Sequence, residues 1–143
     1  VTSLPAELPL VSVDPVLLEQ VFVNLLENAA KYTPVKSPIE IHARAIDEAV
    51  VIEVADRGPG LPHGAEQKIF EKFYRVPTPE NQRIPGTGLG LCLVKEIMEL
   101  QGGAIQMDSR HGQGTTVRMW MPLLSTQSRE AAKDERAQPL VMN

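Results

Sequence analysis

Hydrophobic residues recur at helical spacing in two segments of the chain. In residues 16–32 they return at steps of three and four, and the resulting apolar stripe contains Leu18, Phe22, Leu25 and Ala29. Asp14-Pro15 comes directly before, and an acidic cap followed by proline predicts that a helix begins there. Residues 89–100 form the second predicted helix, which Gly102-Gly103 ends.

Short apolar or alternating segments predict the strands of a sheet. Two of them flank Asp47-Glu48, and two more flank a turn that contains Gly112 and Gly114, so each pair is expected to form an antiparallel hairpin. A further short apolar run near the start of the chain predicts one more strand. The predicted strands are residues 8–13, 39–45, 50–55, 104–108 and 115–121.

The connections between these elements contain most of the prolines. Residues 64–73 are expected to hold one short helix. Residues 76–85 contain three prolines and no hydrophobic period, which predicts a long, mobile loop. From residue 125 to residue 143 the sequence is polar with balanced charge, so a C-terminal tail is expected there.

Composition restricts the class of protein. The chain has 143 residues, a hydrophobic content of 43% and a net charge of −4, which fits one globular domain. Strong non-specific binding of nucleic acid is not expected, because it usually needs a basic face. Its single cysteine, Cys92, excludes an internal disulfide and a cysteine-rich zinc site. Neither a signal peptide nor an apolar run of membrane-spanning length is visible. Because the chain starts at Val1 and not at Met, we expect a segment of a longer protein.

The polar stripe of the first predicted helix is the first candidate site. Asn24 and Asn28 lie one turn apart, in line with Gln20, Glu27 and Lys31. Asparagine is a poor helix former, and amide oxygens suit a hard cation such as Mg²⁺ that also binds phosphate. On this stripe alone, an ordinary solvated face is the favoured interpretation.

Two glycine-containing segments are further candidates. Asp56 ends an apolar strand before Gly58-Pro59-Gly60, so its carboxylate could accept a hydrogen bond from an amino group such as that of adenine, although a simple turn has the same pattern. Residues 86–91 (GTGLGL) open a helix, where free N–H groups bind phosphate. This segment is not a Walker A loop, because Leu91 replaces the required lysine, and the strand that a dinucleotide-binding fingerprint needs is missing.

The remaining chemistry-bearing residues predict structural roles. His42, His63 and His111 share no metal-ligand spacing. Cys92 is expected to be a small buried residue. The other expectations concern aromatic side chains: we place Phe70, Phe73 and Tyr74 in the core beneath the proline-rich loop, and Trp120 in the core or covering it.

Taken in order, the segments resemble the ATP-binding catalytic domain of bacterial sensor histidine kinases. The resemblance runs from about Leu8 to Leu123 and rests on five motif blocks at matching spacing. These blocks are residues 24–33 (NLLENAAKYT, the N box), 56–60 (DRGPG, the G1 box), 69–75 (IFEKFYR, the F box), 86–91 (the G2 box) and 112–115 (GQGT, the last glycine block). Residues 58–62, 66–67 and 84–85 are similar to the potassium-limitation (Kdp-type) sensor kinases.

This resemblance implies a fold and a set of site residues. The fold is a two-layer α/β sandwich of the Bergerat type, in which a mixed, mainly antiparallel sheet packs on about three helices, within a domain of residues 1–124. Residues 76–85 would be the lid over ATP, and Asn28 would bind Mg²⁺. The implied catalytic residues are Asn24, Glu27, Asn28 and Lys31. The implied nucleotide-binding residues are Tyr32, Asp56, Gly58, Gly60, Lys72, Arg75, Gly86, Thr87, Gly88, Leu89, Gly90, Leu91 and Thr115.

The implied activity is phosphoryl transfer from MgATP. The γ-phosphoryl group would pass to a histidine on a separate dimerisation domain of the same protein, and then to an aspartate of a response regulator. None of His42, His63 and His111 has the His-Glu context of that acceptor, so we expect the segment alone to be inactive. The resemblance also implies the cytoplasmic domain of a sensor anchored in the inner membrane, with membrane contact only through other parts of that protein.

Other functions of the same fold remain open at this point. One is an ATPase similar to the gyrase and Hsp90 relatives, or a non-catalytic ATP-sensing module. In the ATPase relatives a glutamate at the position of Asn24 activates water, so asparagine there favours transfer to a protein. A more remote alternative is a serine kinase of the anti-sigma type.

Overall fold

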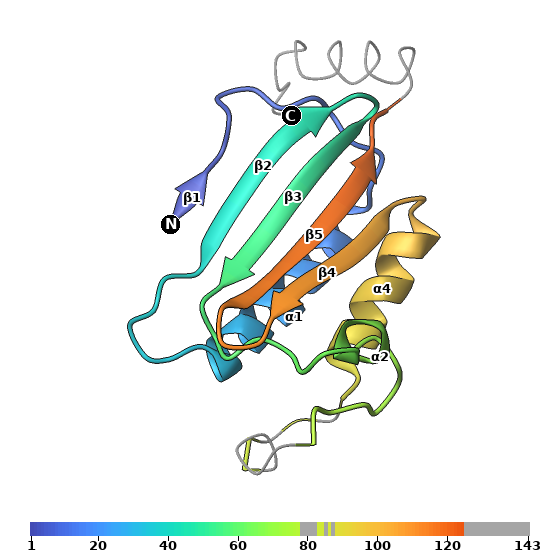
Figure 1. The fold of residues 1–143 in the computed structure, drawn as a ribbon. Coiled ribbons are helices and arrows are strands. Elements are labelled where there is room, and N and C mark those ends of the chain that lie inside the picture. Colours follow the sequence, from blue (N-terminus) through green and yellow to red (C-terminus); the bar gives the residue numbers. More distant parts are fainter. Residues whose placement is uncertain (78–82, 85, 87, 125–143) are drawn as a thin grey trace, which may run out of the picture.

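The computed structural model describes residues 1–77, 83–84, 86 and 88–124 (Figure 1). A five-stranded sheet, in the order β1-β2-β3-β5-β4, forms one layer of the fold. The first pair is parallel and the other three are antiparallel. The strands are β1 (Thr2–Ser3), β2 (Glu40–Ile46), β3 (Ala49–Asp56), β4 (Ala104–Arg110) and β5 (Gly114–Pro122).

The described helices are α1 (Pro15–Tyr32), α2 (Ala65–Lys68) and α4 (Gly90–Leu100). Asp14 caps α1, because its Oδ1 accepts hydrogen bonds from the N–H groups of Val16 at 2.8 Å and Leu17 at 3.3 Å. The backbone N–H of Asp14 also donates to the Gln101 side chain, which ties the start of α1 to the end of α4. Among the described residues, no helix is both long enough and apolar enough to cross a membrane.

Helices α1 and α4 pack side by side on one face of the sheet and form the second layer (Figure 1). The apolar stripes of both helices meet the inward side chains of β3, β4 and β5, and each fully buried aliphatic side chain contributes about 1.5–3 kcal/mol. The buried core consists of Val21, Leu25, Val50, Val54, Leu91, Val94, Ile97, Met98, Met107, Val117, Met119 and Met121.

The other face of the sheet carries charged side chains together with Val51 and Trp120. Glu53 alternates with the inward residues of β3 and accepts a hydrogen bond from Arg118 at 2.7 Å, and Arg118 also donates to Asp108 at 2.9 Å. The guanidinium of Arg118 lies 5.9 Å from the ring centre of Trp120. Trp120, which is partly buried, therefore covers the outer face of the sheet and does not belong to the core between the layers.

The predicted two-layer α/β fold with a mixed, mainly antiparallel sheet is confirmed. Both hairpins form as predicted, and the short helix lies within residues 64–73. The strand predicted over residues 8–13 is wrong: only an isolated bridge joins Val11 to Leu123, while the two-residue β1 pairs with β2. Pro9 lies within this run and has no backbone N–H to donate to a neighbouring strand, and Pro5 and Pro15 flank the run.

Two glycines allow the loop after β3 to touch the turn between β4 and β5. A Cβ on Gly60, whose φ is +70°, would lie 2.1 Å from the carbonyl oxygen of Arg110. A Cβ on Gly114, whose φ is +102°, would lie 2.1 Å from the carbonyl oxygen of Asp56. These close approaches exclude any side chain at either position, and they bring two of the predicted motif blocks together at one end of the sheet.

Candidate functional site

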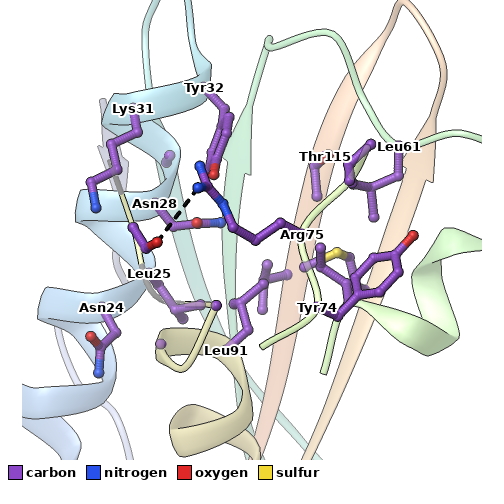
Figure 2. Close-up of a pocket in the computed structure, with 18 of the residues that line it drawn as sticks. Asn24, Leu25, Asn28, Lys31, Tyr32, Leu61, Tyr74, Arg75, Leu91 and Thr115 are labelled. Carbon is purple, nitrogen blue, oxygen red and sulfur yellow. Dashed lines mark hydrogen bonds between the residues drawn. The ribbon is translucent and has the colours of Figure 1, made fainter. Parts of the chain in front are cut away.

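A cavity of about 750 Å³ opens between α1, the start of α4 and the ends of β3 and β5 (Figure 2). This volume lies within the range of about 300–1,000 Å³ that is usual for small-molecule sites. Tyr74 and Arg75, from the segment after α2, border the cavity across from α1 (Figure 2). The cavity therefore has room for a ligand the size of a nucleotide.

One end of the cavity is apolar and contains a single carboxylate. Val54, Met107 and Val117 from the sheet and Leu61 from the loop after β3 form its walls. Asp56, the last residue of β3, lies among them and is half-buried. An apolar slot with one hydrogen-bond acceptor suits a flat ring that bears an amino group.

Local backbone contacts fix the position of the Asp56 carboxylate. Its Oδ1 accepts a hydrogen bond of 2.8 Å from the N–H of Gly58. Burial raises the pKa of the Asp56 carboxyl above its usual range, although backbone hydrogen bonds from Gly58 and Thr115 oppose that rise. A Cβ on Gly58 would lie 2.7 Å from the carbonyl oxygen of Tyr32, so this loop also packs against the end of α1.

The other end of the cavity is polar and is formed by the stripe on α1. Asn24, Asn28 and Lys31 lie along one face of the helix and border the cavity (Figure 2). The amide nitrogen of Asn24 is buried and has no hydrogen-bond partner among the residues that the structure describes. Since a buried polar group without a partner is costly, this amide has the properties of a group that pairs with a ligand.

Basic side chains also border the cavity. Lys31 from α1 borders it, and so does Lys72 from the segment after α2. The guanidinium of Arg75 extends towards α1, beside Tyr32 and Asn28, and donates to the carbonyl oxygens of Ile84 and, at 3.5 Å, Gly86 (Figure 2). Positive charges beside amide groups suit a polyphosphate.

The amide groups fit a magnesium ion that binds together with a ligand. Among the residues that the structure describes, no group of three or more His, Cys, Asp and Glu side chains could hold a metal on its own. The oxygen ligands of Mg²⁺ would then come from Asn28, from the phosphates and from water, which is the usual arrangement at nucleotide sites.

Most of the site residues implied by the resemblance border this one cavity. Gly58 does not border it, and its N–H instead positions the carboxylate of Asp56. Thr87 lies outside the described residues, as does part of the expected lid, of which the structure describes 76–77 and 83–84. The residues that do border it are Asn24, Glu27, Asn28, Lys31, Tyr32, Asp56, Gly60, Lys72, Arg75, Gly86, Gly88, Leu89, Gly90, Leu91 and Thr115.

Sequence reasoning missed the apolar wall of the cavity. Val54, Met107 and Val117 occupy ordinary inward positions of the strands, so no local pattern separates them from the core. Cys92 is buried as expected, and it also borders the cavity. His111, in the turn after β4, is a further residue at the cavity.

The core position predicted for Phe73 is wrong. Its side chain is 69% exposed, and its φ of +64° lies in the left-handed region. The backbone N–H of Phe73 donates to the carbonyl oxygen of Gly88 at 3.0 Å, which joins the segment after α2 to the glycine segment before α4. Phe70 is partly buried against the core, whereas Tyr74 borders the cavity.

Comparison with known proteins identifies the family to which this chain is similar. The family described as histidine kinase-, DNA gyrase B- and HSP90-like ATPase matches residues 13–125. The chain is 42% identical over 120 residues to the sensor protein KdpD of Escherichia coli, 38% over 109 residues to the circadian input-output histidine kinase CikA of Synechococcus elongatus, and 37% over 124 residues to the sensor protein kinase WalK of Staphylococcus haemolyticus. These alignments cover 76–85% of this chain but only 13–20% of each relative.

Solved structures agree with this result. The mycobacterial sensor histidine kinase MprB is similar with a TM-score of 0.69 and 28% identity, covering 85% of this chain and 82% of that one. Full-length ShkA in complex with AMPPNP is similar with a TM-score of 0.73 and 30% identity, covering 87% of this chain and 26% of that one. The chain belongs to the histidine kinase-, DNA gyrase B- and HSP90-like ATPase family, as a domain of the type found in sensor histidine kinases.

Proposed function

We propose that this domain binds MgATP in the cavity and supplies the γ-phosphoryl group to a histidine on a dimerisation domain. The observation that supports this most strongly is the polarity of the cavity. A single carboxylate, Asp56, lies at its apolar end, and amides with basic side chains lie at its other end. Adenine and a triphosphate have the same polarity, and the similar structure of ShkA holds AMPPNP.

In this proposal the base lies against Val54, Met107 and Val117, and its amino group donates a hydrogen bond to the Asp56 carboxylate. Thr115, which is the cross-strand partner of Asp56, borders the same end of the cavity. A site built to accept an amino hydrogen disfavours a purine with a carbonyl oxygen at that position, because two acceptors would then face each other. The domain should therefore prefer ATP to GTP.

The triphosphate lies between α1 and the F box. Lys31, Lys72 and Arg75 neutralise part of its charge, and the glycines at 86, 88 and 90 let backbone N–H groups approach the phosphates. The amide oxygen of Asn28 holds Mg²⁺, with the amide of Asn24 one turn away. When bound, Mg²⁺ neutralises charge that develops on the phosphate oxygens during transfer.

The rest of the proposed pathway lies outside this domain. Phosphoryl transfer is mostly a matter of positioning and charge, so the partner must present its histidine to the open side of the cavity. Relay to a response-regulator aspartate follows, and we place the domain on the cytoplasmic side of a membrane-anchored sensor. A Kdp-type identity, with potassium as the input, stays a proposal, because identities of 42% to KdpD, 38% to CikA and 37% to WalK do not separate the Kdp type from other sensor kinases.

A phosphotransfer assay tests the proposal. The domain is incubated with γ-labelled MgATP, alone and with a separately produced dimerisation domain that carries a His-Glu helix. We expect acid-labile phosphohistidine on the partner only, and ATP that survives long incubation with the domain alone, because Asn24 replaces the glutamate of the hydrolases. Rapid release of phosphate by the domain alone would support the ATPase alternative instead.

A further inference from the structure

Three polar side chains form a row across the end of the sheet. In the strand register, Asp56 of β3 is the partner of Thr115 of β5, and Thr115 is the partner of Ser109 of β4. Side chains alternate between the two faces of a sheet, and all three residues lie an even number of positions from inward residues of their own strands. They therefore lie on the side of the sheet that faces the cavity. Asp56 and Thr115 border the cavity, whereas Ser109 lies behind Thr115 and does not.

The hydroxyl of Ser109 has three polar neighbours. Its Oγ accepts a hydrogen bond of 2.7 Å from the N–H of Leu61, in the loop after β3. It lies 2.9 Å from Oγ1 of Thr115 and 3.2 Å from the carbonyl oxygen of Gly114. Ser109 therefore connects the wall of the cavity at Leu61 to the polar group at Thr115.

The single hydrogen of the Ser109 hydroxyl determines which group donates in each of these hydrogen bonds. A serine hydroxyl has one hydrogen to donate and two lone pairs. The carbonyl oxygen of Gly114 can only accept, so the hydrogen of Ser109 goes there when all three bonds form together. The remaining lone pair then accepts the hydrogen of Thr115, and the Thr115 hydroxyl presents only lone pairs to the cavity.

We propose that Ser109 is a positioning residue for base recognition, which orients the Thr115 hydroxyl as an acceptor beside the Asp56 carboxylate. Two adjacent acceptors match the two hydrogens of a 6-amino purine and disfavour a 6-oxo purine. This role rests on the proposed function, because it assumes that a purine nucleotide occupies the cavity. Ser109 itself does not contact the base.

Substitution of Ser109 tests this role. In Ser109→Ala the Thr115 hydroxyl is free to rotate and donate, so we expect the preference for ATP over inosine triphosphate to fall about 5- to 10-fold, which is the value of one hydrogen bond. Ser109→Thr retains the hydroxyl and should retain the preference. Thr116→Val removes a hydroxyl from the opposite face of β5 and serves as the matched control, which should bind as the parent does.

A double-mutant cycle separates orientation from simple support of the fold. In a Thr115→Val background, Ser109→Ala should cause no further loss of selectivity, because the hydroxyl that Ser109 orients is already absent. The Ala variant is expected to fold, since the N–H of Gly112 still donates to the carbonyl oxygen of Pro59 at 2.6 Å and holds the same two loops together. Ser109→Cys, which is nearly isosteric, gives a second variant with a weak donor.

The possible results separate the two proposals. If the parent binds ATP and Ser109→Ala keeps full selectivity, or loses as much in the Thr115→Val background as in the parent, the role of Ser109 is overturned and the proposed function is not. If the parent binds neither nucleotide, the proposed function fails and the role of Ser109 fails with it. Loss in Ser109→Ala, retention in Ser109→Thr and no loss in the Thr115→Val background would support the role.

Discussion

At the scale of single residues, the sequence of α1 alone does not determine whether its polar stripe faces solvent or a binding site. Asn24 and Asn28 are poor helix formers on what resembles a solvated face. In the fold both are partly buried, and within the described part of the chain the amide nitrogen of Asn24 has no hydrogen-bond partner. Because residues far along the chain, such as Lys72, Arg75 and Gly88, complete the cavity, the location of this stripe at a cavity could not be predicted from the periodicity of α1.

Asn28 is the residue on which magnesium dependence should rest. Asn28→Ala removes an amide oxygen without disturbing the packed face of α1, so the variant should fold. We expect its affinity for MgATP to fall about 10-fold or more, since the lost contact is to a charged group, and its Mg²⁺ dependence to weaken. Titration calorimetry with and without Mg²⁺ measures both.

Gln20→Ala is the matched control for that experiment. Gln20 lies on the same stripe of α1 but is exposed and does not border the cavity, so its removal should leave MgATP binding unchanged. Parental binding and parental Mg²⁺ dependence in Asn28→Ala would remove Asn28 from the metal site.

Asp56 should give the free domain a pH-dependent stability. Burial raises the pKa of this carboxyl in the folded state above the ordinary 3.8. The folded state therefore holds its proton more tightly, and the resulting stabilisation is present below pH 3.8 and lost as the pH rises through the raised pKa. Asp56→Asn keeps the acceptor for the N–H of Gly58 and does not titrate.

We expect the free energy of unfolding of Asp56→Asn, relative to the parent, to increase as the pH rises from 3 to 7. Urea denaturation without nucleotide, at a series of pH values, measures this difference. A difference that is independent of pH would show that burial does not shift the pKa of Asp56.

At the scale of elements, local sequence signals predict some helices and strands, whereas tertiary contacts determine the features that the sequence does not predict. Asp14-Pro15 and the Asp47-Glu48 turn act within a few residues, and the helix start and the hairpin that they predict both form. By contrast, β1 is two residues long and exists only because β2 lies beside it. The exposure of Phe73 likewise depends on its contact with Gly88, fifteen positions away, which no local pattern encodes.

The cap of α1 gives a prediction at this scale. Asp14→Ala removes the acceptor for two N–H groups of the first turn. We expect a loss of about 1 kcal/mol in the free energy of unfolding, with a range of about 0.5–2 kcal/mol. Asp14→Ser can still cap and should recover most of it. Equal stability of Asp14→Ala and the parent in urea denaturation would mean that packing alone determines where α1 begins.

At the scale of the whole molecule, the candidate site exists only when distant segments meet. Its apolar end combines strands that begin at residues 49 and 114, and its polar end combines α1 with the F box. The motif blocks identify the polar and glycine residues because their spacing resembles that of a family. The apolar walls were not predicted, since an inward valine or methionine of a strand has the same pattern whether it contacts core or cavity.

The binding of nucleotides to the parent domain and to Asp56→Asn tests the central claim most directly. Titration calorimetry with MgATP and MgGTP should give saturable binding of ATP and a clear preference over GTP for the parent. Asp56→Asn should bind ATP about 10-fold more weakly or worse, because a hydrogen bond to a charged group is lost, and its preference over GTP should shrink. Equal affinity of the parent for both nucleotides, or unchanged selectivity in Asp56→Asn, would contradict the assignment of this cavity to ATP.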